Sequence, residues 1–210
     1  MTYKEKATAW FLVSMYMGGL VGIALPVHED FVLLTPFNLL ASLSLILWHH
    51  PKWDRPLSTF VLLCFFTGFL VELAGVQTGL IFGEYQYGEV LGWKIWGTPL
   101  IIGINWAMLV YASASSVNYF FGKLSSFSKI ILGALSMTLL DVLIEPVAIH
   151  LDFWSWGGID VPLQNYLAWF IIALPLQAAY HQLLGEVTNK VAVVLFILQF
   201  LFFGIMAYLI

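Results

Sequence analysis

Seven apolar stretches, each close to the length that a bilayer requires, most constrain what this chain can fold into. They run at roughly 7–25, 31–48, 57–80, 97–121, 128–150, 162–184 and 190–209. A helix needs about 20 apolar residues to cross the hydrocarbon core of a membrane. Of the 210 residues, 61% are hydrophobic and only 10% are charged, more apolar surface than a water-soluble fold buries. The sequence therefore predicts an all-α polytopic membrane protein, a bundle of about seven transmembrane helices.

The polar segments between these stretches are short, and none is rich in Ser or Pro. Linkers between domains are usually rich in such residues, so we expect residues 1–210 to form a single transmembrane helical domain. The first stretch has an alternative interpretation as a signal peptide behind Lys4 and Lys6. Its apolar core is longer than that of a signal peptide, and no clear small-residue cleavage site follows it, so a transmembrane helix is the expectation.

Positive charges are distributed unequally between the two ends of the predicted helices. Those on the side of the N-terminus are Lys4, Lys6, Lys52, Arg55, Lys123, Lys129 and Lys190, whereas only Lys94 falls on the other side. Because cytoplasmic loops carry an excess of Lys and Arg, we expect a cytoplasmic N-terminus and an outer C-terminus, in a prokaryotic cytoplasmic membrane. One miscounted span would change this orientation. The same charges form no basic patch, so nucleic acid is not an expected partner.

The third and fourth stretches resemble the fifth and sixth, which indicates a weak internal repeat. Each half contains an acid, two aromatic residues thirteen and fifteen positions later, a Pro-Leu pair, a tryptophan seven positions after the proline, and an asparagine. In the first half these are Glu72, Tyr85, Tyr87, Pro99, Trp106 and Asn105; in the second they are Asp141, Trp154, Trp156, Pro162, Trp169 and Asn165. Both halves run outward and back, so a duplication would have its axis along the membrane normal. The alternative is coincidence among aromatic-rich helices.

The depth of the polar residues in the membrane indicates whether they can meet. At about 1.5 Å per residue, we expect Glu72, Asp141, Asn105 and Trp169 to lie within roughly 3–6 Å of the midplane, on its outer side. Glu145 lies one helical turn beyond Asp141 on the same face. Small residues beside Glu72 would let another helix approach closely; they are Gly68, Gly75 and Gly79. The bundle can therefore bring the three carboxyl groups together.

Three acids inside a membrane bundle indicate chemistry. An ionised carboxylate in hydrocarbon costs several kcal/mol, so Glu72, Asp141 and Glu145 are expected to face the interior and to act on a ligand. The alternative is that they are protonated, or paired with amide side chains as fasteners between helices. Because burial and mutual repulsion disfavour the charged form, at least one acid should hold a proton at neutral pH while a neighbour stays ionised. Such a set can donate and accept protons.

Aromatic and amide side chains are expected to surround the acids and bind the substrate. The candidates are Asn105, Trp106, Asn165, Trp169, Tyr85, Tyr87, Trp154 and Trp156. Aromatic faces stabilise cations. Trp and Tyr also collect at membrane interfaces, and for the four loop aromatics that interpretation is equally open. An acid in an aromatic, lipid-accessible pocket suits protonation of a carbon–carbon double bond, which gives a carbocation. The expected substrate is a polyene lipid.

The sequence predicts no metal and no cofactor. There is no His-x-x-x-His or Glu-x-x-His pattern that would hold a metal. Cys64 is the only cysteine, so a thiolate cluster within one chain is excluded. A glycine-rich phosphate loop is also absent, so nucleotide use is not expected.

Several motifs resemble one known family in the same order along the chain. They span about residues 68–175 and comprise Glu72-Leu-Ala-Gly75-Val-Gln-Thr78-Gly79, Phe82-Gly83-Glu84-Tyr85-Gln-Tyr87, Pro99-Leu100 with Trp106, Asp141 through Glu145-Pro146, and Asn165 with Trp169. The chain thereby resembles the carotenoid biosynthesis membrane protein family, which includes carotenoid 1,2-hydratases such as those of γ-carotene and of bacterioruberin precursors. The resemblance implies cofactor-free addition of water to the terminal double bond of an acyclic ψ-end group, which gives a tertiary alcohol. The hydratases carry Asp-Pro where this chain has Glu145-Pro146, which leaves the exact substrate and reaction open.

The depth arrangement, rather than the resemblance, suggests roles for the acids. We expect Asp141 to donate the proton, Glu72 to act as its partner and Glu145 to position water. A carotene cyclase of the lycopene type is a rival, because it makes the same cation and excludes water. A non-catalytic carotenoid-binding or transport protein is another, in which the acids bind polar ends or relay protons.

Overall fold

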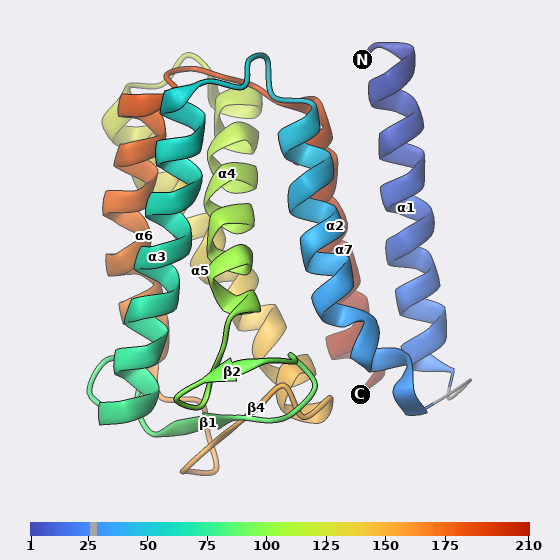
Figure 1. The fold of residues 1–210 in the computed structure, drawn as a ribbon, viewed down its shortest axis with the longest axis vertical. Coiled ribbons are helices and arrows are strands. Elements are labelled where there is room, and N and C mark those ends of the chain that lie inside the picture. Colours follow the sequence, from blue (N-terminus) through green and yellow to red (C-terminus); the bar gives the residue numbers. More distant parts are fainter. Residues whose placement is uncertain (26–28) are drawn as a thin grey trace.

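The computed structural model describes residues 1–25 and 29–210, and its described part contains seven α-helices (Figure 1). They are α1 (Tyr3–Ala24), α2 (Thr35–Trp48), α3 (Arg55–Thr78), α4 (Ile101–Phe121), α5 (Ser126–His150), α6 (Leu163–Leu183) and α7 (Lys190–Leu209), with a 3₁₀ helix, η1 (Glu29–Leu34), before α2. The predicted all-α bundle is confirmed. The chain ends lie at opposite ends of the bundle (Figure 1), as an odd number of crossings requires.

Five segments are long and apolar enough to cross a membrane: α1, η1 with α2, α3, α5 and α7. The two remaining helices, α4 and α6, have 21 residues each and fall outside this set. Of these, α4 is almost wholly buried and packs against α2, α3, α5, α6 and α7. A helix enclosed by other helices meets protein rather than lipid, so it tolerates polar residues. The apolar outer helices indicate an integral membrane protein, and its orientation in the membrane stays a prediction.

Two predicted stretches have different boundaries in the structure. The stretch at 31–48 is divided into η1 and α2 beside Pro36, which lies in the first turn of α2, where the missing proline N–H is not needed. The stretch at 97–121 becomes helical only at Ile101. The residues before it form a hairpin of β2 (Lys94–Ile95) and β3 (Thr98–Pro99).

Two further strands form a short antiparallel ribbon that the sequence did not predict. Strand β1 (Tyr85–Tyr87) follows α3, and β4 (Trp154–Trp156) follows α5. Tyr85 pairs with Trp156, and Tyr87 with Trp154, around the central pair Gln86–Ser155. The ribbon crosses one end of the bundle (Figure 1), which we call the ribbon end.

The ribbon pairs the two segments that the internal repeat made equivalent. A two-fold axis through the central pair of an antiparallel ribbon exchanges the two strands. In the internal repeat the same exchange would relate α3–α4 to α5–α6, and both of these pairs pack together. The pairing therefore supports the repeat.

Glycines allow close packing of the helices, as the small residues beside Glu72 predicted. A side-chain carbon at Gly68 of α3 would collide with the Trp106 ring of α4, and one at Gly103 of α4 would lie 2.7 Å from a ring carbon of Phe65. Membrane helices approach most closely at small residues. This contact brings α4 against α3 at the level of Glu72.

Candidate functional site

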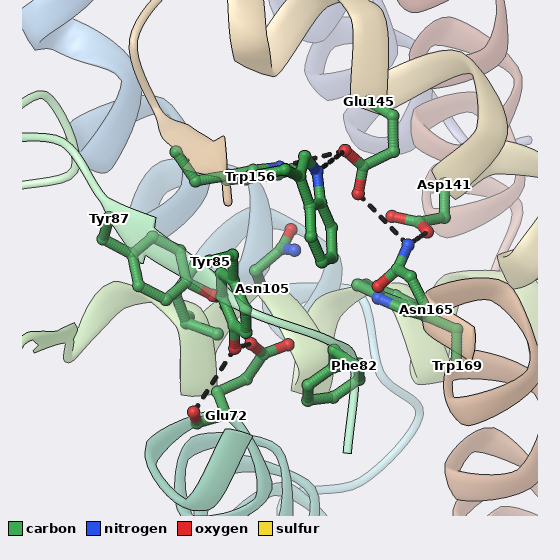
Figure 2. A pocket seen from close by; sticks show the side chains of 12 residues that line it. Glu72, Phe82, Tyr85, Tyr87, Asn105, Asp141, Glu145, Trp156, Asn165 and Trp169 are labelled. Atoms are coloured by element: carbon green, nitrogen blue, oxygen red, sulfur yellow. Dashed lines mark hydrogen bonds between the residues drawn. The ribbon is translucent and has the colours of Figure 1, made fainter. Parts of the chain in front are cut away.

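The three predicted acids face one cavity near the ribbon end of the bundle (Figure 2). Glu72 comes from α3, and Asp141 and Glu145 come from α5. Their side chains are only 4%, 1% and 2% exposed. The structure thus brings together carboxyl groups from separate helices inside the bundle.

The lining of the cavity contains nearly every residue that the sequence singled out. It consists of Glu72, Phe82, Tyr85, Tyr87, Ile102, Asn105, Asp141, Glu145, Trp154, Trp156, Asn165 and Trp169. Its volume is about 30 Å³, which is room for about one or two water molecules. Among the described residues, the lining includes no Lys, Arg or His, so none of these residues places a fixed positive charge beside the acids.

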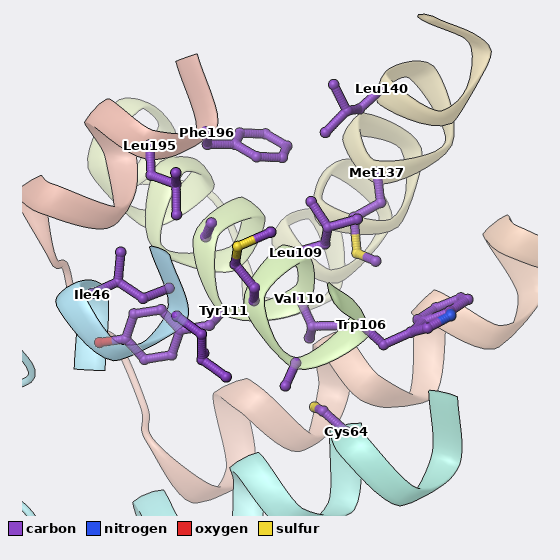
Figure 3. Packing of buried hydrophobic residues seen from close by; sticks show 14 of the residues in the cluster. Ile46, Cys64, Trp106, Leu109, Val110, Tyr111, Met137, Leu140, Leu195 and Phe196 are labelled. Carbon is purple, nitrogen blue, oxygen red and sulfur yellow. The ribbon is translucent and has the colours of Figure 1, made fainter. Parts of the chain in front are cut away.

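Trp106 is the one predicted residue that lies behind the lining. Its ring stacks on Trp169 with centroids 4.3 Å apart and planes 18° apart, and its Nε1–H donates to Oε1 of Glu72 at 3.1 Å. It is fully buried and belongs to the apolar core around α4 (Figure 3). Trp106 therefore joins the core to the acid site.

Three donors hold Glu72. The hydroxyls of Tyr85 and Tyr87 donate to its Oε2 at 2.6 and 2.8 Å, and Trp106 donates to its Oε1. Burial raises the pKa of both tyrosines, which therefore stay protonated and able to donate. A carboxyl group that accepts on both oxygens is stabilised as the anion.

Glu145 is held in the same way by different residues. The indole N–H groups of Trp154 and Trp156 donate to its Oε2 at 3.0 and 2.9 Å. The amide of Asn165 donates to its Oε1 at 3.2 Å. This carboxyl group also accepts on both oxygens, so it too fits the ionised form.

Asp141 differs from the other two acids. Its Oδ2 accepts from the amide of Asn165 at 2.8 Å. Its Oδ1 is buried and has no hydrogen-bond partner among the described residues. Asp141 therefore has one oxygen free to carry a proton, and a single amide, that of Asn165, links it to Glu145.

The ribbon explains why the loop aromatics reach the acids. Side chains two residues apart on a strand point to the same face, so Tyr85 and Tyr87 face the cavity together, as do Trp154 and Trp156. The rings also contact one another across the ribbon, with centroids 5.2 Å apart for Tyr85–Trp156 and 5.9 Å for Tyr87–Trp154. The four loop aromatics thus form a roof over the acids at the ribbon end of the bundle.

In its hydrogen bonding, the counterpart of Glu72 is Glu145 rather than Asp141. The equal spacing of the repeat had matched Glu72 with Asp141, but the two ribbon tryptophans donate to Glu145. The reason is distance from the helix end: α3 ends six residues after Glu72, and α5 ends five residues after Glu145 but nine after Asp141. Asp141 therefore lies deeper, out of reach of the ribbon.

Two lining residues, Phe82 and Ile102, were not selected from the sequence. Phe82 is 1% exposed and packs edge-on against Tyr85, with centroids 6.0 Å apart. It lay within a quoted motif but has no polar group that would have marked it. Within the described ranges, no group of three or more His, Cys, Asp or Glu side chains is arranged to hold a metal ion.

Comparison with known proteins agrees with the resemblance seen in the motifs. A curated relative, bisanhydrobacterioruberin hydratase of Haloarcula japonica, is 28% identical over 159 residues, which is 73% of this chain and 54% of the relative. The chain thus spans about half the length of that relative. No solved structure shows significant similarity. A family model described as carotenoid biosynthesis protein matches residues 32–210. Because this match covers most of the chain, the protein belongs to the carotenoid biosynthesis protein family.

Proposed function

We propose that the protein is a carotenoid hydratase that adds water to the terminal double bond of an acyclic ψ-end group by acid catalysis. The observation that carries the proposal is the unequal bonding of the three acids: two accept on both oxygens, while Asp141 keeps one buried oxygen free. The family and the name of the curated relative support the same chemistry.

Asp141 is the proton donor in this mechanism. Three neighbouring negative charges in a cavity without a lining cation would be costly, so one acid holds a proton. Oδ1 of Asp141 is the carboxyl oxygen that no donor occupies. Its O–H bond breaks as a C–H bond forms at C2 of the substrate, and the electron pair of the double bond leaves a tertiary cation at C1.

Glu72 and Glu145 stabilise that cation. The mechanism requires both of them to be ionised; both are buried, and their donors fix them before the reaction begins. Preorganised charge in a water-poor site is among the strongest means of stabilising a transition state. The stacked Trp169 ring lines the same space and adds an aromatic face.

Water then completes the addition. A water molecule beside Glu145 attacks C1, forms the C–O bond and passes its surplus proton to that carboxylate. Asn105 also lines the cavity and is placed to orient the water. The proton then passes from Glu145 back to Asp141 through a water molecule in the cavity that both acids line. Asn165 holds the two α5 acids side by side, because its amide N–H groups donate to both of them. One water is added, nothing is oxidised or reduced, and no cofactor takes part.

A carotene cyclase is the second candidate, and the small aromatic cavity is the observation in its favour. A volume of about 30 Å³ under an aromatic roof limits water, and a cation deprived of water is attacked by a neighbouring double bond. Hydration and cyclisation therefore differ in whether water reaches C1.

Expression of the chain in a host that accumulates lycopene or γ-carotene separates these functions. Hydration adds the mass of one water, cyclisation keeps the mass and shifts the absorption spectrum, and a pure binding protein leaves the pigment unchanged. D141N and E72Q should each abolish conversion without preventing folding. E89Q is the matched control, because the Glu89 side chain is exposed and forms its ion pair with Lys94, outside the lining of the acid cavity. An active D141N/E72Q double variant would refute the acid mechanism.

A further inference from the structure

An apolar groove lies on the outside of the bundle, next to the acid cavity. Its walls are Leu80 and Ile81, in the loop after α3, and one stripe of α6 from Leu163 to Ile171. Its volume is about 360 Å³. The α6 residues Leu163 and Ile171 are 70% and 62% exposed. In a membrane bundle such a surface faces lipid tails.

At three places in the sequence, a residue that lines the groove is followed directly by a residue that lines the acid cavity. Ile81 lines the groove and the next residue, Phe82, lines the cavity. On α6, Gln164 and Ala168 line the groove, and the residues that follow them, Asn165 and Trp169, line the cavity. The same short segments therefore line the lipid-facing groove with one residue and the acid cavity with the next.

A side chain of α6 holds the loop that carries Phe82. Gln164 donates from its Nε2 to the carbonyl oxygens of Leu80 and Ile81, at 2.6 and 3.2 Å, and so ties the loop to α6. Glycines with positive φ bracket the loop, Gly79 at +67° and Gly83 at +113°, a conformation that other residues rarely adopt. Movement of this segment away from α6 would therefore break the Gln164 contacts.

We propose that this groove binds the polyene chain of the carotenoid, so that its end group enters the acid cavity past Phe82. The proposal rests on the proposed function for the identity of the end group. A polyene is straight, rigid and apolar, and the α6 stripe offers an apolar wall roughly 12 Å long at about 1.5 Å per residue. The one polar side chain in the groove, Gln164, has its amide N–H groups turned to the loop backbone. The cavity, at about 30 Å³, holds no end group until the loop moves.

Binding is measured separately from catalysis by using the D141N protein, which should not convert substrate. The protein is placed in phosphatidylcholine nanodiscs, lycopene is added, and quenching of tryptophan fluorescence reports binding to the protein. Ala168→Phe fills the groove, and Ala207→Phe makes the same change on α7, away from it. We expect the D141N protein to bind lycopene more tightly than empty nanodiscs take it up. In the D141N protein, A168F should weaken lycopene binding about tenfold, and A207F should leave it unchanged.

A milder pair of variants tests occupancy even if A168F does not fold. Leu167→Cys places a thiol in the groove, and Val21→Cys places one near the ribbon end of α1; the two native side chains are 53% and 48% exposed. Cys64 is fully buried and contributes little background. Bound lycopene should slow labelling of L167C by a methanethiosulfonate reagent and leave V21C unchanged.

The proposal that the groove binds the polyene would be refuted if lycopene changed the labelling of both cysteines equally. It would also be refuted if A168F and A207F bound lycopene equally well. Lycopene binding by D141N that is no tighter than uptake by empty nanodiscs would refute the proposal too, because phospholipid chains would then fill the groove as well as a polyene does. If wild-type protein adds no water while D141N still binds lycopene through the groove, the hydratase proposal fails and the groove stands.

Discussion

Replacing Tyr85 by Phe removes one hydroxyl from the roof of the site and little else. That hydroxyl donates to Oε2 of Glu72 at 2.6 Å, and the ring keeps its contacts with Trp156 and Phe82. A hydrogen bond to a charged group contributes about 1.5–3 kcal/mol. If the bond supports an anion that stabilises the cation, its loss slows conversion about 10- to 150-fold, at 1.36 kcal/mol per tenfold.

The assay is the rate of water addition by purified protein in nanodiscs, with product followed by mass. Tyr180→Phe is the matched control. Tyr180 is fully buried and donates to the carbonyl oxygen of Val187 at 2.9 Å, far along α6 from the acids. Its loss should lower the unfolding temperature and leave the rate per folded protein unchanged.

Two results would refute this reasoning. The first is a Y85F protein that keeps the full wild-type rate, which would mean that the charge on Glu72 does not matter. The second is a Y180F protein that slows as much as Y85F, which would mean that any lost buried hydrogen bond acts through folding.

Three other predictions concern the groups behind the site. Asn165→Leu removes the amide shared by the two α5 acids and should slow conversion about 100-fold, whereas an unchanged rate would show that the amide is not needed to position them. Gly68→Leu collides with Trp106 and should lower the free energy of unfolding by about 1–3 kcal/mol; Gly18→Leu, with nothing within 4 Å, should not, as denaturant titration would reveal. Asn189→Ala removes the N-cap of α7 and should cost about 1–2 kcal/mol of stability without changing the rate per folded protein.

The helices were predictable because membrane solvation imposes a length. An apolar run of about 20 residues must be helical in lipid, and this fixed all seven helices to within a few residues. The convergence of Glu72, Asp141 and Glu145 followed from the same rule, since depth along parallel helices translates directly into position. Charges are too costly in lipid to face outward.

The ribbon was not predictable, because its strands have three residues each and their aromatic side chains are typical of membrane interfaces as well. Without the ribbon, the donors to the acids could not be assigned, and the equal spacing of the repeat matched Glu72 with Asp141. Phe82 had no signal beyond its place in a motif. The size of the cavity depends on how all these side chains pack, which no spacing encodes.

The central claim is that one of the three buried acids holds a proton and that it is Asp141. Infrared spectroscopy of the protein in lipid, compared between H₂O and D₂O, detects the carbonyl stretch of a protonated carboxyl group. The account predicts one such band in the wild-type protein, which is absent from D141N and retained in E72Q and E145Q. A band that persists in D141N and disappears in E72Q or E145Q would contradict it.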